Sequence, residues 1–246
     1  MELIFKKIFT LSNSDADSHG KAKASALLRL AQEAAAGHCE ELHLDWHTLA
    51  EKNMFWAVIR QQVHITRLPQ VGETITVETW PMPTTRTAFP RSTAAYDANG
   101  KELFRCISLW VLMDFQARSM ILPGKSGIDV PGILRGNELP TPQSLTPTAG
   151  ENHLSRAVCS IDLDQNGHMN NARYMDWIDD LLPDTFHKEH PLREFSVCYL
   201  SEALENQSLE LNWVLDADLN LRVDALRQRT DVPDKKDRIF AAHLVF

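Results

Sequence analysis

The chain has 246 residues, 43% of them hydrophobic, and its 25 basic and 33 acidic side chains give a net charge of −8 at pH 7. This composition is that of ordinary globular domains and excludes intrinsic disorder, collagen and coiled-coil arrays. The negative charge gives no electrostatic basis for binding a nucleic-acid backbone, so nucleic acid is excluded as a partner. The length suits one large or two modest domains.

No apolar stretch is long enough to span a membrane, and the first residues lack the apolar core of a secretory signal. We therefore expect a cytoplasmic protein that binds no membrane. The four cysteines lie far apart and form no CxxC pair, which predicts buried, reduced thiols. These residues are Cys39, Cys106, Cys159 and Cys198.

The first half of the chain, residues 1–122, predicts a strand, then a helix, then a run of strands. Apolar residues three or four apart predict the helix at 21–42, with Asp17 and Ser18 available to cap it. The turn Asp97-Ala98-Asn99-Gly100 indicates a hairpin within the last run. The predicted strands are 3–11, 55–68, 72–82, 88–113 and 118–122.

Residues 123–150 are rich in proline and glycine, which is typical of a linker. After it, in residues 151–246, the same order of elements returns. A strand is predicted first, then a helix from about 168 to 182 that stops at Pro183, then more strands. The predicted strands are 153–163, 193–204, 207–217, 219–229 and 237–246.

Short segments repeat between the two halves. Residues 15–21 overlay 162–168 at an offset of 147, and residues 63–68 overlay 197–202 at an offset of 134. We infer a duplicated domain. Each copy would bury the apolar stripe of its helix against one face of a mostly antiparallel sheet, which is an α+β arrangement.

The most specific stretch is residues 162–174, in which seven of thirteen residues are Asp, Asn, Gln or His. Capping of a helix explains one or two of them. The remainder indicates a functional site, because a helix N-terminus offers N–H donors to an oxyanion while nearby side chains place a water and a titratable group. The stretch holds one histidine, His168, and the pair Asn170-Asn171 beside further carboxylate and carboxamide groups.

Glu202 is a further candidate. On a strand it shares one face with Cys198 and Leu200, which predicts a carboxylate that points toward the core or a cleft. Burial there would raise its pKa and suit it to accept a proton from water. The alternative is that the strand ends at Ser201 and that Glu202 lies in solvent.

The pattern Asp164-x-Asn166-x-His168-x-Asn170-Asn171-x-x-Tyr174, followed by Tyr199-Leu200-Ser201-Glu202, resembles the fatty acyl-ACP thioesterases of plastids and bacteria. Segments 77–80 and 109–113 extend the resemblance into the first half, so that it covers nearly the whole chain. The resemblance implies two tandem hotdog domains, each a long helix wrapped by an antiparallel sheet. It also implies hydrolysis of the thioester between a fatty acyl chain and acyl carrier protein, which releases free fatty acid.

Carried over by position, the family's catalytic residues fall on Asp164, Asn166, His168 and Glu202 of the C-terminal domain, 151–246. The first domain, 1–122, has other residues at the matching places and resembles a degenerate half that shapes the acyl pocket. Those residues are Asp17, His19, Lys21 and Leu68.

We expect direct attack by water, and no metal or cofactor, because the thiolate of the carrier's phosphopantetheine arm is a good leaving group. Many plant members have a cysteine directly after the catalytic Glu, whereas this chain has Ala203, so a Cys–His acyl-enzyme route through that position is closed. Glu202 with His168 would activate the water. Backbone N–H groups near Gly167 and His168, with the Asn166 amide, would hold the oxyanion. Whether Glu202 or Asp164 is the base stays open.

The implied partner is acyl carrier protein with a phosphopantetheine-linked acyl chain. Because that carrier is acidic, we predict that basic residues between positions 86 and 135 form its docking face. Formation of a homodimer stays open. The basic residues are Arg86, Arg91, Lys101, Arg105, Arg118, Lys125 and Arg135.

Two other functions remain as alternatives. A hotdog dehydratase or hydratase would move a proton on the acyl chain, and a non-catalytic module would bind acyl-ACP without turnover. Three other motifs predict no function. The residues His38, Cys39, His43 and His47 lack the tighter, repeated spacing of metal sites, and Gly124-Lys125-Ser126 has Ser119 where a phosphate loop has its first glycine. No Gly-x-Ser-x-Gly serine elbow is present.

Overall fold

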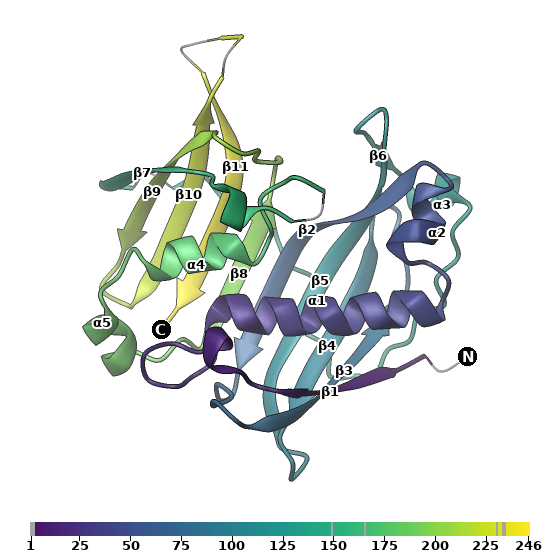
Figure 1. Ribbon diagram of the computed structural model, residues 1–246, viewed down its shortest axis with the longest axis horizontal. Coiled ribbons are helices and arrows are strands. Elements are labelled where there is room, and N and C mark those ends of the chain that lie inside the picture. Colours follow the sequence, from purple (N-terminus) through teal and green to yellow (C-terminus); the bar gives the residue numbers. More distant parts are fainter. Residues whose placement is uncertain (1–2, 149, 165, 230, 233–234) are drawn as a thin grey trace. The chain divides into compact units, whose positions relative to one another are not determined.

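The computed structural model describes residues 3–148, 150–164, 166–229, 231–232 and 235–246. The chain forms two compact units, Met1–Pro142 and Gln143–Phe246. In Figure 1 the first unit runs from purple to teal and the second from green to yellow. Among the described residues, no helix combines the length and the apolar character that crossing a membrane requires.

The first unit contains one long helix and an antiparallel sheet with the strand order β1-β3-β4-β5-β2, to which β6 is added beside β5. In Figure 1 the helix α1 lies across the sheet, and it contacts β1 and β3. The elements are β1 (Phe5–Thr10), the 3-10 helix η1 (Asn13–Asp15), α1 (Ala24–Glu41), α2 (Trp46–Ala50), β2 (Met54–Ile65), β3 (Thr74–Pro81), β4 (Phe89–Tyr96), β5 (Glu102–Asp114), β6 (Met120–Ile121) and α3 (Pro123–Ser126).

The second unit repeats this plan with the strand order β7-β9-β10-β11-β8, again antiparallel throughout. The first, third, fourth, fifth and second strands thus follow one another across the sheet in both units. The elements are β7 (Asn152–Ala157), the 3-10 helix η2 (Ser160–Asp162), α4 (Arg173–Asp179), α5 (Asp184–Glu189), β8 (Glu194–Tyr199), β9 (Ser208–Leu215), β10 (Asn220–Gln228) and β11 (Lys236–Val245).

The repeat extends to single hydrogen bonds. Ala22 N donates to Pro69 O over 2.8 Å, and Met169 N donates to Ala203 O over 2.9 Å, which reproduces the offsets of 147 and 134 found in the sequence. An isolated bridge joins Lys21 to Gln70 in the first unit, and the matching bridge joins His168 to Leu204 in the second. The two units are therefore copies of one local design.

The core of each unit lies between its helix and its sheet. In α1 the buried residues recur three or four apart, as at Leu27, Leu30, Ala31 and Ala34, and this spacing places them on one face of the helix. Trp177 of α4 is buried in the same way in the second unit. The predicted pairing of one helix stripe with one sheet face is confirmed.

The predicted cap of the first helix is wrong. The helix was expected at 21–42 with Asp17 and Ser18 as caps, but α1 begins after Lys23, whose side chain makes no capping bond. Asp17 instead accepts hydrogen bonds from the backbone of His19 and Lys21, both at 2.9 Å. It therefore folds the turn that precedes the helix.

The second helix is shorter than the predicted span of 168–182. Residues 168 and 169 pair with the segment 203–204, and the Asn170 side chain accepts a bond from Ala172 N over 2.9 Å, so α4 begins only at Arg173. It ends at Asp179, and the further short helix α5 follows Pro183. Here a side-chain hydrogen bond from a polar residue replaces the backbone bonds that would extend the helix toward its N-terminus.

The predicted hairpin between β4 and β5 is confirmed. Asp97 N donates to Lys101 O over 2.9 Å, and the Asp97 carboxylate accepts from the backbone of Asn99 and Lys101. Gly100 takes a φ of 77°, in the left-handed region that glycine adopts at no steric cost.

Most of the segment predicted as a linker, residues 123–142, belongs to the first unit. Ile133 N donates to Pro81 O over 2.9 Å, and Arg135 lies 2.6 Å from the Glu78 carboxylate. The later residues are held within the second unit, where Arg238 donates to the carbonyls of Leu145 and Thr146 at 2.7 and 2.8 Å.

Candidate active site

Asp164 organises a tight turn between η2 and α4. Its Oδ1 accepts hydrogen bonds from Asn166 N over 2.8 Å and from His168 N over 3.4 Å. Gly167 donates its N–H to Asp164 O over 3.0 Å and has a φ of 76°. Short polar side chains that bond the backbone just ahead are typical of such turns. The Asp164 carboxylate therefore fixes the backbone that carries Asn166 and His168.

The first unit contains the same turn around Asp17, with Gly20 at a φ of 74° in place of Gly167. That unit has Leu68 where the second has Glu202. The turn aspartate is thus present where no acid stands opposite it. This indicates that Asp164 positions its neighbours.

His168 and Glu202 lie together in the second unit. The imidazole Nε2 of His168 is 3.5 Å from Oε2 of Glu202, and the side chains are 19% and 45% exposed. The bridge from His168 to Leu204, together with the bond from Met169 N to Ala203 O, holds the turn beside the loop that carries Glu202. The sequence predicted that these two residues act together, and the structure places their side chains close to each other.

The expected burial of Glu202 is wrong. The strand predicted over 193–204 ends at Tyr199, because the N–H groups of Leu200 and Ser201 both bond to Ile239 O, at 2.9 and 3.2 Å. Two successive donors on one carbonyl end the regular ladder, and the chain leaves the sheet. Leu200 is 48% exposed, and the Glu202 carboxylate lies in a loop that solvent reaches.

The backbone groups expected to hold the oxyanion are already bonded. Gly167 N donates to Asp164 O, and His168 N points to Asp164 Oδ1. Asn166 N also donates to Asp164 Oδ1. Asn166 itself is exposed to solvent. The two backbone donors predicted at Gly167 and His168 thus already have partners within the turn, and their oxyanion role stays a prediction.

Aromatic packing supports the site from within the second unit. Tyr174 of α4 stacks on Phe240 of β11, with ring centroids 4.6 Å apart, and Tyr199 Oη donates to Asn171 O over 3.2 Å. Burial raises the pKa of the Tyr174 phenol well above its ordinary value, so it stays neutral and acts as a packing group. These contacts fix α4, and with it the residues that follow the Asp164 turn.

Two polar residues that hold the Glu202 loop were not predicted from the sequence. Arg227 of β10 donates to Glu202 O, and Gln207 accepts from Leu204 N. Neither belongs to a local motif, since Arg227 follows Glu202 by 25 residues. The offset of 134 was the available signal, because it aligns Gln207 with Glu73 of the first unit.

His38, the first of the histidines and cysteine clustered at positions 38–47, has a packing role. His38 is buried, stacks on Phe5, and receives a hydrogen bond from Arg91 at its Nδ1 over 3.1 Å. Since a guanidinium is only a donor, this Nδ1 carries no proton. Within the described ranges, no group of three or more His, Cys, Asp or Glu residues could hold a metal ion. Gly124-Lys125-Ser126 lies in the short helix α3.

Two of the seven basic residues predicted to form the docking face for the carrier are buried. Arg91 and Arg105 are 7% and 5% exposed, so neither offers a charge to a partner. Arg135 pairs with Glu78. The two arginines lie on opposite faces of the sheet: Arg91 points to the face covered by α1, where it donates to His38, and Arg105 pairs with Glu102 on the other face. A count of basic residues along the chain does not register this burial.

The cysteine prediction is correct in part. All four cysteines are free thiols, and Cys106 and Cys198 are buried. Cys159 is exposed, because it caps the 3-10 helix η2 at the surface, where its backbone N donates to Asp162 over 3.0 Å. Cys39 is half-buried, and the expectation of burial is wrong for Cys159.

Comparison with known proteins gives the family. Residues 2–122 match the acyl-ACP thioesterase N-terminal domain, and residues 147–229 match the acyl-ACP thioesterase C-terminal domain. The dodecanoyl-[acyl-carrier-protein] hydrolase of Cinnamomum camphora is 25% identical over 225 residues, 85% of this chain. The palmitoyl-acyl carrier protein thioesterase of Gossypium hirsutum is 25% identical over 230 residues, also 85% of this chain. The chain spans 58% and 54% of these two chloroplastic relatives.

Solved structures show the same fold over nearly the full chain. An acyl-ACP thioesterase from Bacteroides thetaiotaomicron matches with a TM-score of 0.85 and 22% identity, over 99% of this chain and 97% of its own. The 12:0-ACP thioesterase of Umbellularia californica matches with a TM-score of 0.81 and 21% identity, over 100% of this chain and 97% of its own. The predicted α+β fold of the hotdog type is confirmed. Since the two family domains match in order and cover most of the chain, the chain belongs to the acyl-ACP thioesterase family.

Proposed function

We propose that this protein hydrolyses the thioester of fatty acyl-acyl carrier protein and releases free fatty acid and the carrier thiol. The observation that carries the proposal is the 3.5 Å separation of His168 Nε2 and Glu202 Oε2, on a turn and a loop that are bonded to each other. Membership of the acyl-ACP thioesterase family supports the substrate class.

Glu202 is the proposed base. Its carboxylate is 45% exposed, so water reaches it, and it lies close enough to His168 for the imidazole to orient the same water. The water oxygen attacks the thioester carbonyl carbon while its proton passes to Glu202. When the tetrahedral intermediate collapses, the carbon–sulfur bond breaks, and the departing thiolate of the phosphopantetheine arm takes up a proton.

The Asn166 side-chain amide is the proposed donor to the oxyanion. The neighbouring backbone N–H groups are engaged by Asp164, which leaves the side chain of the same turn as the donor beside His168. Asp164 acts as a positioning residue, because its carboxylate is bonded to the backbone that presents Asn166 and His168.

A covalent route through a cysteine next to the base has no support in this chain. The residue after Glu202 is Ala203, which is buried and whose carbonyl accepts the bond from Met169 N. Hydrolysis by direct attack of water is therefore the proposed route, and no metal or cofactor takes part in it. A cytoplasmic location, formation of a homodimer and an acyl pocket shaped by the first unit remain predictions.

The experiment that tests the proposal is a product assay with a panel of acyl-ACPs and the matched acyl-CoAs. We expect release of free fatty acid from acyl-ACP. Interconversion of hydroxyacyl and enoyl thioesters without release of acid would contradict the proposal in favour of a hydratase. Binding of acyl-ACP without any turnover would contradict it in favour of a binding module.

A further inference from the structure

The backbone of Glu202 is held by a guanidinium group from a neighbouring strand. Arg227 of β10 donates from Nη1 to Glu202 O over 2.9 Å and to Gln207 Oε1 over 2.8 Å. The same Gln207 oxygen accepts the N–H of Leu204 over 3.0 Å. We call this set of bonds among Arg227, Gln207, Glu202 and Leu204 the loop clamp.

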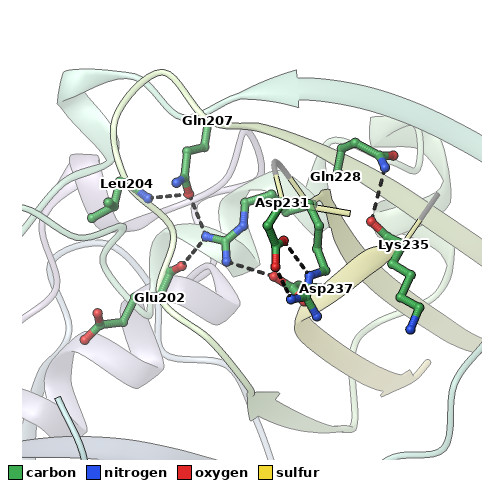
Figure 2. A network of polar contacts seen from close by, with 9 residues as sticks. Glu202, Leu204, Gln207, Gln228, Asp231, Lys235 and Asp237 are labelled. Atoms are coloured by element: carbon green, nitrogen blue, oxygen red, sulfur yellow. Dashed lines mark hydrogen bonds and ion pairs between the residues drawn. The ribbon is translucent and has the colours of Figure 1, made fainter. Parts of the chain in front are cut away.

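Figure 2 shows the geometry of the loop clamp. The carbonyl oxygen of Glu202 and the side-chain oxygen of Gln207 meet at one guanidinium group, while the Glu202 carboxylate points away from it. The other side of that guanidinium faces the Asp237 carboxylate of β11 at 3.3 Å. Arg227 therefore bonds the main chain of Glu202 and ion-pairs with a different acid.

The clamp has a specific task, because Glu202 lies outside the strand ladder. On one side the loop is bonded to the Asp164 turn through Met169 N and Ala203 O. On the other side the clamp bonds it to β10 and to Gln207 near the start of β9. Between these two attachments the backbone of Glu202 has a fixed place, which sets the direction of its carboxylate toward His168.

The first unit builds the same clamp around Leu68. Arg67 Nη1 donates to Leu68 O over 3.3 Å and to Glu73 over 2.9 Å, and Glu73 accepts the N–H of Gln70 over 2.9 Å. Each acceptor corresponds to its partner in the second unit at the offset of 134. The clamp thus exists also in the copy that has no acid at this position.

The two clamps differ in where the arginine stands. Thr76 pairs with Tyr96, and at the same place in the second unit Glu210 pairs with Leu226. The residues that follow Tyr96 and Leu226 therefore correspond; these are Asp97, just after the end of β4, and Arg227, within β10. In the first unit the arginine is in the loop, and Asp97 lies 3.8 Å from it on the strand side. In the second unit the arginine is on the strand, and the loop position before Glu202 is Ser201.

We propose that Arg227 is a positioning residue for Glu202, which holds the main chain of the base from β10 while its carboxylate faces His168. This inference rests on the proposed function of Glu202. A guanidinium bound to the carbonyl oxygen fixes the loop without neutralising the carboxylate, and its position on β10 keeps the cation out of the loop next to the base. The first unit, which has no base, places its arginine in the loop.

Steady-state kinetics on acyl-ACP test the proposal. We expect Arg227→Ala to lower kcat by about 10²-fold, the scale of a misplaced catalytic group, while KM changes little. Arg227→Lys keeps the cation but not the planar fork, which bonds Glu202 and Gln207 through Nη1 and Asp237 through Nη2, so it recovers part of the lost rate. Retention of wild-type kcat in Arg227→Ala would overturn the proposal.

Two matched controls separate positioning from general stability. Arg67→Ala removes the clamp of the first unit and is expected to lower the Tm by a similar amount while leaving kcat unchanged. Arg229→Ala removes an arginine on the same side of the unit that pairs with Asp231 and Asp237 and makes none of the clamp bonds. If Arg67→Ala lowered kcat as much as Arg227→Ala, the effect would be one of stability and the proposal would fall.

Hydrogen exchange at single amides gives a readout that does not depend on turnover. Arg227→Ala should speed exchange at Leu204 N–H, while Arg67→Ala should speed it at Gln70 N–H and leave Leu204 unchanged. Unchanged exchange at Leu204 in Arg227→Ala would overturn the clamp whatever the kinetics. Failure of the wild-type protein to release fatty acid would instead overturn the proposed function and, with it, the role of Arg227 in positioning a base.

Discussion

Asp17 and Asp164 do the same work in the two units: each carboxylate accepts the backbone N–H groups of the residues two and four positions further along the chain. Only the second unit has a histidine, His168, at the end of this turn and a glutamate, Glu202, beside that histidine. The aspartate thus belongs to the repeated fold, while the residues it presents differ between the copies.

We predict that Asp164→Asn lowers kcat by less than about tenfold, below the ~10²–10⁴ expected of a general base. Asparagine keeps an oxygen that accepts the same two N–H groups, so the turn persists. Asp164→Ala should cost about 1–3 kcal/mol of stability, as two hydrogen bonds are lost, and Asp17→Ala should cost a similar amount without lowering kcat. A loss of 10²-fold or more in Asp164→Asn would make Asp164 a candidate for the base.

Asn166→Ala is predicted to lower kcat by about 10²–10³-fold with KM little changed, which is the effect of removing one oxyanion donor. The turn survives, because it uses the backbone N of residue 166 and not its side chain. His19→Ala, at the corresponding position of the first unit, is the matched control and should leave kcat unchanged. Equal kcat values in Asn166→Ala and the wild type would exclude the amide as that donor.

Stability at acid pH should depend on Glu78 in the first unit. Burial alone would raise the pKa of this carboxyl, but bonds and charges from Lys6 and Arg135 outweigh it and hold the pKa below the ordinary 4.5. Because the folded pKa is the lower one, the stabilisation is complete above pH 4.5 and is lost as pH falls through the folded pKa.

Chemical unfolding at about pH 5 and about pH 3 measures this effect. Glu78→Gln should cost about 1.5–3 kcal/mol at the higher pH, the range for a hydrogen bond to a charged group, and should reduce the loss of stability on acidification. An equally steep pH dependence in Glu78→Gln would show that other carboxyls carry it.

One thiol should react in the native protein. Cys159 is exposed and Cys198 is buried, while burial raises the pKa of Cys106 to about 12 and also raises that of Cys39. Iodoacetamide at about pH 8, near the ordinary thiol pKa, should therefore label Cys159 alone, and mass spectrometry identifies the site. Cys159→Ser should abolish labelling and retain kcat, since the proposed reaction uses no cysteine. Loss of turnover in Cys159→Ser would contradict hydrolysis without a thiol.

Much of the fold could be predicted from the sequence, because the duplication leaves a local signature. The offsets 147 and 134 mark pairs such as Ala22 with Pro69 and Met169 with Ala203, whose backbone bonds are the same in both units. The hairpin at Asp97 follows from turn chemistry that acts within five residues. Such features depend on neighbours in the chain and are visible in it.

The features that the sequence missed depend on residues far apart in the chain. Alternation predicted that Glu202 continues a strand, but the single carbonyl of Ile239 takes two successive N–H groups and ends that strand at Tyr199. The inward direction of Arg91 is set by strand pairing, and the support of Glu202 by Arg227 comes from another strand. The periodicity of residues 193–204 indicates neither the end of that strand nor the contact from Arg227.

The most direct test of the account is the kcat of Glu202→Gln on acyl-ACP, compared with Glu205→Gln, which neutralises an exposed acid on the same loop. The account predicts a loss of about 10²–10⁴-fold for Glu202→Gln and wild-type turnover for Glu205→Gln. A Glu202→Gln protein within about tenfold of wild type would contradict it.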